Sequence, residues 1–253
     1  MKQFLVIFPL LLTLVFSQAE AQGPRSHDYN SIGWLATFLT YNLDEKWSVH
    51  GEFQWRRSEL VKEAQQNLYR AGINFKPHKQ ALLRVGLAYA DTYPYGKVPI
   101  QSTARLFPEY RTYQMAQINN PIGNVGLTHR FILEQRWVGR YTNTTLAKVD
   151  DYVFMNRVRY MVRMQIPLSS LFLENNAPYI AAYDEVMIGF GKNINQNVFD
   201  QNRIGLLGGV KLSERVRVEG GYLNQILQFG RMVEDKELFQ HNNGLIINTY
   251  INL

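Results

Sequence analysis

Apolar and polar residues alternate with a period of two along most of the chain. Between Asp151 and Ile166, one set of alternate positions is mainly aromatic and aliphatic, and the interleaved set carries Arg157, Arg159 and Arg163. This pattern is typical of a β-strand with an apolar and a polar face. It predicts eleven strands, at Ile32–Tyr41, Trp47–Arg56, Asn67–Lys76, Ala81–Tyr93, Arg105–Gln117, Asn124–Trp137, Asp151–Ile166, Pro178–Phe190, Phe199–Leu212, Val216–Gln228 and Gly244–Leu253.

The predicted strands are long, and their connections fall into two groups. A transmembrane strand needs roughly 9–11 residues, whereas strands in globular proteins average about five or six. Short connections at Asn42–Lys46, Pro77–Gln80, Asn119–Gly123 and Ser213–Arg215 alternate with longer polar ones at Ser58–Gln66, Pro94–Ala104, Gly139–Asp150 and Arg231–Gln240. Outer-membrane barrels sort their connections in this way. We therefore predict one all-β domain, an antiparallel transmembrane β-barrel of about 10–12 strands.

The predicted strand number raises a question of topology. Single-chain bacterial barrels normally have an even number of strands. With eleven strands and the short turns on the periplasmic side, Ile32–Tyr41 would run towards the periplasm and the N-terminus would lie outside. Either Gln22–Ser31 returns along or through the barrel, or one predicted strand is wrong.

Residues 1–21 have the pattern of a cleaved signal peptide. Lys2 precedes the apolar run Phe4–Phe16, and Ala19 and Ala21 form a small-x-small cleavage site before Gln22. A membrane anchor is the alternative, but the run is shorter than the roughly 20 residues that a spanning helix needs. We expect residues 22–253 to form the outer-membrane barrel domain, inserted by the barrel-assembly machinery, with Leu253 in the place of the usual terminal Phe.

Composition narrows the class of protein further. The chain has no cysteine, which excludes a disulfide scaffold and thiolate metal sites. The mean hydropathy of −0.25 is too low for a helical membrane protein but suits a barrel whose strands each have a polar face. The net charge is +6. Because export makes a nucleic-acid partner improbable, we expect the charge to face the lumen or anionic outer-membrane lipid.

The polar faces of the predicted strands are strongly basic. Thirteen positive residues are assigned to the lumen, with five glutamates: Arg56, Arg70, Lys76, Arg84, Arg111, Arg130, Arg136, Arg157, Arg159, Arg163, Arg203, Lys211 and Arg217 against Glu52, Glu109, Glu134, Glu185 and Glu219. The main candidates are Arg111, Glu109, Arg130, Glu134, Arg136, Arg157, Arg159, Arg163, Glu185, Arg203, Arg217 and Glu219. Two interpretations follow: Arg–Glu pairs that fill the barrel, or a positive excess that binds or passes a small anionic solute.

Motifs for catalysis are weak. His27, His50, His78, His129 and His241 lack metal-ligand spacing, and neither a nucleophile elbow nor a phosphate-binding loop occurs. We predict no catalytic, cofactor-binding or metal-binding residue. An outer-membrane enzyme with a Ser, His and acid on the barrel rim remains an alternative, as does a purely structural or interaction barrel. The Tyr93–Gly96 segment is expected to adopt a special loop conformation, because Pro94 breaks strand pairing and Gly96 permits positive φ.

Seven stretches together resemble a known family. They are Trp34–Trp47, Tyr93–Gly96, Glu109–Gln114, Arg130–Arg136, Arg157–Tyr160, Phe199–Arg203 and Gly220–Gln225. Their order is similar to that of the domain-of-unknown-function 2490 family (DUF2490), which is thought to comprise outer-membrane barrels. The resemblance covers nearly all of the expected mature chain and implies a barrel fold. It transfers no activity and no catalytic residue, because the family has none established.

Overall fold

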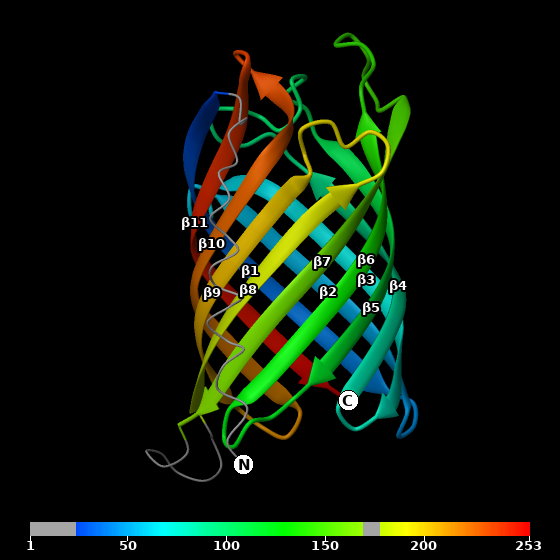
Figure 1. Cartoon of the computed structure of the whole chain (residues 1–253), viewed down its shortest axis with the longest axis vertical. Coiled ribbons are helices and arrows are strands. Elements are labelled where there is room, and N and C mark those ends of the chain that lie inside the picture. The colour runs from blue at the N-terminus through cyan, green and yellow to red at the C-terminus, as the bar shows by residue number, and fades with distance from the viewer. Residues whose placement is uncertain (1–23, 169–177) are drawn as a thin grey trace, which may run out of the picture.

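The computed structural model describes residues 24–168 and 178–253 as a closed barrel of eleven strands (Figure 1). The strands are β1 (Arg25–Asn42), β2 (Trp47–Ser58), β3 (Glu63–His78), β4 (Ala81–Thr92), β5 (Phe107–Asn119), β6 (Gly126–Arg140), β7 (Asp151–Pro167), β8 (Pro178–Phe190), β9 (Phe199–Lys211), β10 (Val216–Val233) and β11 (Lys236–Asn252). The prediction of an all-β barrel is thus confirmed. The predicted signal peptide, residues 1–21, lies outside the described residues. Within them, no helix is long and apolar enough to cross a membrane.

Barrel closure answers the question raised by the odd strand number. Strands consecutive in sequence pair antiparallel throughout, whereas β1 and β11 pair in parallel, with Ile32 opposite Gly244. In an up-and-down meander of eleven strands, the first and last strands must run in the same direction. The sheet is therefore mixed at this single seam, and the expectation of a fully antiparallel barrel is corrected there.

Side chains alternate between the outside and the interior along each strand. On β7, Tyr152, Phe154 and Val158 are exposed, whereas Arg157 and Arg159 are buried. The period of two places successive side chains on opposite faces of the sheet. The apolar set of positions therefore forms the outer surface, and the arginines of β7 point inward.

Four strands extend at least five residues further than the pattern indicated. β3 spans Glu63–His78 rather than Asn67–Lys76, so the predicted loop Ser58–Gln66 shortens to residues 59–62. β1 begins at Arg25 rather than Ile32, and β10 and β11 are joined by a tight hairpin at Glu234 and Asp235, whose φ values are 51° and 60°. The predicted long loop Arg231–Gln240 is therefore wrong. The segment was not predicted as a strand because its inward positions are polar. Gln240 is buried inside the barrel, whereas Phe239 lies on the outer face.

The two ends of the barrel carry different connections. Loops 93–106, 141–150 and 191–198 lie at the end where β1 begins, which we call the loop-side end. The connections 43–46, 79–80, 120–125 and 212–215 lie at the opposite, turn-side end. In Figure 1 the loop-side end is at the top and the C-terminus lies near the bottom.

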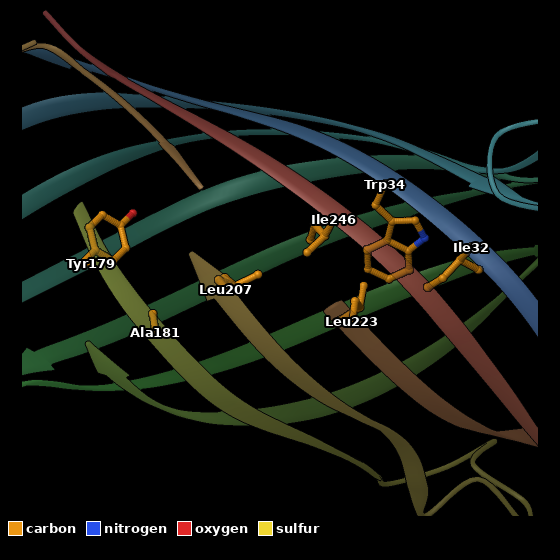
Figure 2. Close-up of a cluster of buried hydrophobic side chains, with 7 residues drawn as sticks. All are labelled: Ile32, Trp34, Tyr179, Ala181, Leu207, Leu223 and Ile246. Carbon is orange, nitrogen blue, oxygen red and sulfur yellow. The ribbon is translucent and has the colours of Figure 1, made fainter. Parts of the chain in front are cut away.

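The barrel interior is filled differently on its two sides. Inward side chains of β1 and β8–β11 form an apolar cluster: Ile32, Trp34, Tyr179, Ala181, Leu207, Leu223 and Ile246 (Figure 2). Inward positions of β3 and β5–β8 carry arginines and glutamates instead. The polar faces of the strands do not all carry charge, and most of the ion-paired residues gather on one wall of the barrel.

Candidate functional site

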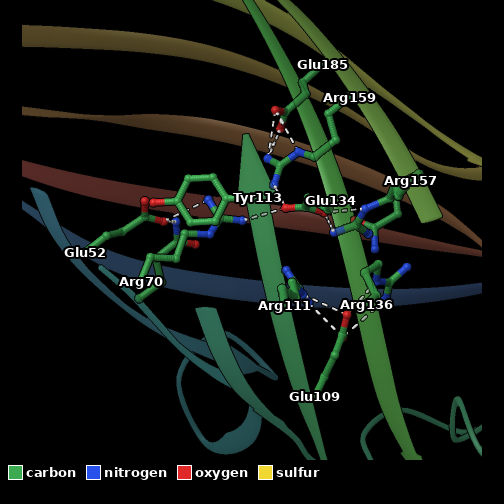
Figure 3. Close-up of polar contacts among 12 residues, drawn as sticks. Glu52, Arg70, Glu109, Arg111, Tyr113, Glu134, Arg136, Arg157, Arg159 and Glu185 are labelled. Carbon is green, nitrogen blue, oxygen red and sulfur yellow. Dashed lines mark hydrogen bonds and ion pairs between the residues drawn. The ribbon is translucent and has the colours of Figure 1, made fainter. Parts of the chain in front are cut away.

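Glu134, on β6, lies at the centre of the ionic wall (Figure 3). Its side chain is almost completely buried and forms ion pairs with Arg70 at 3.3 Å and Arg159 at 2.9 Å. Arg157, which lies opposite Glu134 on β7, donates two hydrogen bonds to the same carboxylate. One carboxylate therefore joins three arginines from two strands, β3 and β7.

The neighbouring carboxylates extend this network in both directions. Glu109 pairs with Arg111 at 2.7 Å and with Arg136 at 2.5 Å. Glu185 accepts hydrogen bonds from Arg159 at 2.8 Å and from Arg130 at 2.9 Å. Buried charges are tolerated when they are paired and fully hydrogen-bonded. These contacts support the first interpretation of the basic face, because most of the arginines serve to fill the barrel.

Asp200 is a further member of the network, and the sequence pattern missed it. It accepts a hydrogen bond from Arg157 and lies 3.6 Å from an Arg136 nitrogen. Strict alternation from Arg203 would point Asp200 outward. The pairing of β8 with β9 shifts register here, so that Met187 faces Gln201 while the next residue faces Phe199. A β-bulge of this kind turns the extra residue out of the alternating order.

Two cavities lie inside the barrel, one on each side of an ionic layer. We define the ionic layer as Arg70, Glu134, Arg157, Arg159 and Glu185. A loop-side cavity of about 580 Å³ is lined by Arg157, a turn-side cavity of about 400 Å³ is lined by Glu185, and Arg70 and Arg159 line both. Arg203 also borders both cavities. The layer therefore divides the described interior into two chambers.

The loop-side cavity is strongly positive. Among the described residues, nine arginines and two carboxylates line it: Arg56, Arg70, Arg111, Arg136, Arg140, Arg157, Arg159, Arg203 and Arg231 against Glu109 and Asp200. Arg56 differs from its neighbours because the partners of its guanidinium are neutral. It donates to Gln54 at 2.9 Å and Gln66 at 2.6 Å, and it lies 4.2 Å from the centre of the Trp34 ring. Its charge is buried without a carboxylate partner in the described structure.

The β4–β5 loop, residues 93–106, lies across the loop-side cavity. Tyr95 is buried and donates a hydrogen bond to Gln240 on β11 at 2.6 Å. From β10, Arg231 donates to the carbonyls of Pro99 at 2.7 Å and Ile100 at 3.1 Å. Since β4 and β10 lie on nearly opposite sides of the barrel, the loop spans the mouth.

Gly96 permits the backbone conformation and the close packing of this loop against β1. Its φ is +70°, and a Cβ at this position would lie 2.5 Å from Asn30 Oδ1. Only glycine combines this conformation with such close packing. The special conformation expected for the Tyr93–Gly96 segment is therefore present.

The predicted candidates separate into three groups by their contacts. Most belong to the connected ionic network: Arg111, Glu109, Arg130, Glu134, Arg136, Arg157, Arg159 and Glu185. Arg163 and Glu219 form a separate pair at 2.7 Å near the turn-side end. Arg203 lies 4.0 Å from Glu185, and Arg217 has no ion pair within the described part of the chain. Lys76 and Lys211, also assigned inward, lie at strand ends, where Lys211 pairs with exposed Glu214.

No group of three His, Cys, Asp or Glu residues in residues 24–168 and 178–253 is arranged to hold a metal ion. Of the histidines, His50 lies inside the barrel, 3.5 Å from Glu52, and His129 contacts the Tyr160 hydroxyl at 2.8 Å. Both contacts hold the ring in place within the wall.

Comparison with protein-family models gives one match, to a family described as "Protein of unknown function (DUF2490)", over residues 32–232. The matched segment runs from within β1 to the end of β10. Comparison with curated proteins gives no match.

Proposed function

The chain belongs to the DUF2490 family, and we propose that it is an outer-membrane β-barrel that binds a small anionic solute in its loop-side cavity. The observation that carries the anion-binding part is the lining of that cavity, in which nine arginines meet two carboxylates. Fixed positive charge in a confined space of low dielectric attracts anions strongly.

The outer surface supports a membrane location. Leu87, Leu206 and Leu245 lie on strands and expose 65%, 55% and 60% of their surface. Soluble monomers rarely expose large continuous apolar patches. Four tyrosines form a chain of neighbouring rings towards the loop-side ends of their strands: Tyr69, Tyr89, Tyr110 and Tyr152. Aromatic girdles of this kind flank the apolar band of outer-membrane barrels.

Arg56 is the residue best suited to contact the solute. Its guanidinium is buried, lines the cavity and, among the described residues, has only neutral hydrogen-bond partners. An anionic oxygen would supply the missing counter-charge through a charge-assisted hydrogen bond. The volume of about 580 Å³ falls within the range of roughly 300–1,000 Å³ usual for small-molecule sites.

The ionic layer favours binding over free diffusion through the barrel. Arg70 and Arg159 contact both cavities and are each held by Glu134. A solute could pass only by displacing these ion pairs. We therefore expect little conductance from the unmodified barrel in a planar bilayer, and a large stable conductance would favour an open pore.

The location is tested by cell fractionation. The protein is expected to stay with outer membranes after a carbonate wash, because an integral barrel is not released by alkali. Release into the soluble fraction would overturn the membrane location and leave an exported soluble barrel.

Binding is tested with the purified barrel in detergent and with phosphate and citrate as probes. Because Arg56 lies against Trp34, anion binding is expected to change tryptophan emission saturably. Arg56→Gln should weaken binding by about tenfold or more. Arg57→Gln is the matched control, because Arg57 lies next in sequence but stacks on Trp55, 4.1 Å from its ring centre. Equal affinities of the two variants would overturn the assignment.

A further inference from the structure

The turn-side cavity contains an arginine that does not belong to the ionic network of the described residues. Arg217 lines this cavity from β10. Among the described residues its guanidinium has neither an ion pair nor a hydrogen-bond acceptor, and its Nε is buried without a partner. A buried donor left unsatisfied costs free energy. An acceptor in the cavity would satisfy this Nε donor.

Glu219, two residues along the same inward face, is already fully engaged. It accepts hydrogen bonds from Arg163 at 2.7 and 3.1 Å and from Asn248 at 3.0 Å. The hydroxyls of Tyr179 and Tyr250 each donate to it at 2.8 Å. A carboxylate has about four lone-pair sites, and these donors use them. Glu219 therefore has no acceptor position left for Arg217.

The Arg217 guanidinium is nevertheless held in place. Its central carbon lies 4.1 Å from the ring centre of Tyr250 and 5.8 Å from that of Tyr179. Both rings are fixed through their hydroxyl groups on Glu219. Stacking on aromatic rings leaves the edge of a guanidinium, with its fork of N–H donors, available to a planar or tetrahedral anion.

The net charge of the residues that line the turn-side cavity also favours an anionic acceptor. Six arginines and three glutamates line it within the described part of the chain: Arg70, Arg130, Arg159, Arg163, Arg203 and Arg217 against Glu52, Glu185 and Glu219. The Nε atoms of Arg130 and Arg203 are also buried without a partner. The unfilled donors are therefore spread around a space of about 400 Å³.

We infer that the turn-side cavity is a second anion site, separate from the loop-side site and centred on Arg217. The ligand class is a small solute that carries a carboxylate or phosphate group, which matches the fork of N–H donors. The ionic layer lies between the two sites. Each site can therefore fill without the other, and the turn-side site can exist even if the loop-side proposal fails.

The test is calorimetric titration of the whole barrel in detergent micelles. Phosphate and citrate are used in separate titrations. Two sites are expected for at least one probe. Arg217→Gln should lower the affinity of one site about tenfold or more, and Arg217→Lys should recover part of it, because charge returns without the fork. Lys211→Gln is the matched control. Lys211 lies opposite Arg217 in the strand register but pairs with the exposed Glu214.

The outcomes separate this inference from the proposed function. Loss of one site in Arg217→Gln and of the other in Arg56→Gln supports both. A single site that responds only to Arg56→Gln overturns the turn-side site. A single site that responds only to Arg217→Gln supports it and overturns the loop-side proposal. Absence of binding of either probe overturns both. If Arg217→Gln does not fold, as judged by the mobility of the unheated barrel on a gel, Arg217→Lys decides the question by its affinity.

Discussion

Inside the barrel, the wall formed by β1 and β8–β11 carries an apolar cluster, whereas the wall formed by β3 and β5–β8 carries paired arginines and glutamates. Apolar side chains on the first wall fit one another without directional partners. Each charge on the second wall depends on a particular partner, and loss of that partner leaves an uncompensated charge. The paired arginines of the second wall therefore serve mainly to stabilise the fold.

In the described part of the chain, two inward arginines without an ion pair lie beside aromatic rings. Arg56 lies 4.2 Å from the Trp34 ring centre, and Arg217 lies 4.1 Å from that of Tyr250. Aromatic faces stabilise a guanidinium without using its hydrogen-bond donors. The comparison teaches that the arginines beside aromatic rings are the ones suited to contact an anion directly, whereas the paired arginines add to the positive lining of the cavities.

The ionic wall should be the most sensitive to a single change. Glu134→Gln removes the carboxylate shared by Arg70, Arg157 and Arg159. Breaking a buried ion pair costs about 3–5 kcal/mol, and we expect a loss of that size in the free energy of unfolding, measured by urea titration in vesicles. Glu214→Gln, at an exposed turn position, is the control. A loss below about 1 kcal/mol would show that the pairs do not support the fold.

The apolar wall should respond to loss of volume. Leu223 is fully buried in the cluster, and Leu223→Ala should destabilise the barrel by roughly 2–5 kcal/mol through lost contacts and the remaining cavity. The same urea titration measures it. Leu212→Ala, at an exposed turn position, should have little effect. Similar losses in both variants would contradict a packed apolar wall.

The outer face can be compared with both inner walls. Val158 is exposed near the middle of β7, and under the proposed membrane location an arginine there would enter the hydrocarbon layer. Val158→Arg should reduce the free energy of folding into vesicles by about 2–4 kcal/mol. Val198→Arg, in the loop between β8 and β9, carries the same change outside the layer. If the two variants fold equally well, the outer face does not contact lipid.

The smallest effect is expected at the turn-side rim. Lys211 pairs with Glu214 at 2.8 Å, but the Glu214 side chain is 92% exposed. Exposed ion pairs contribute about 0–1 kcal/mol, so Glu214→Gln should change stability by less than about 1 kcal/mol. A loss as large as that of Glu134→Gln would remove the distinction between buried and exposed pairs.

The sequence by itself determined the local properties of this protein. Alternation with a period of two is read directly from neighbouring residues, and it sufficed to predict an all-β barrel and the direction of side chains such as Arg157 and Tyr152. It failed where local order is interrupted. Asp200 turns inward at a register shift, and the polar residues before Gly244 concealed the first half of β11.

Only the tertiary structure decided which residues meet across the barrel. Arg70 and Glu134 are 64 positions apart in the chain, and no local pattern specifies their pairing. The parallel seam between β1 and β11 likewise follows from closure of an odd-numbered meander. The division of the lumen into an ionic and an apolar wall arises because closure brings distant inward faces together. In the described part of the chain, that division leaves Arg56 and Arg217 without carboxylate partners while it pairs most of the other candidates.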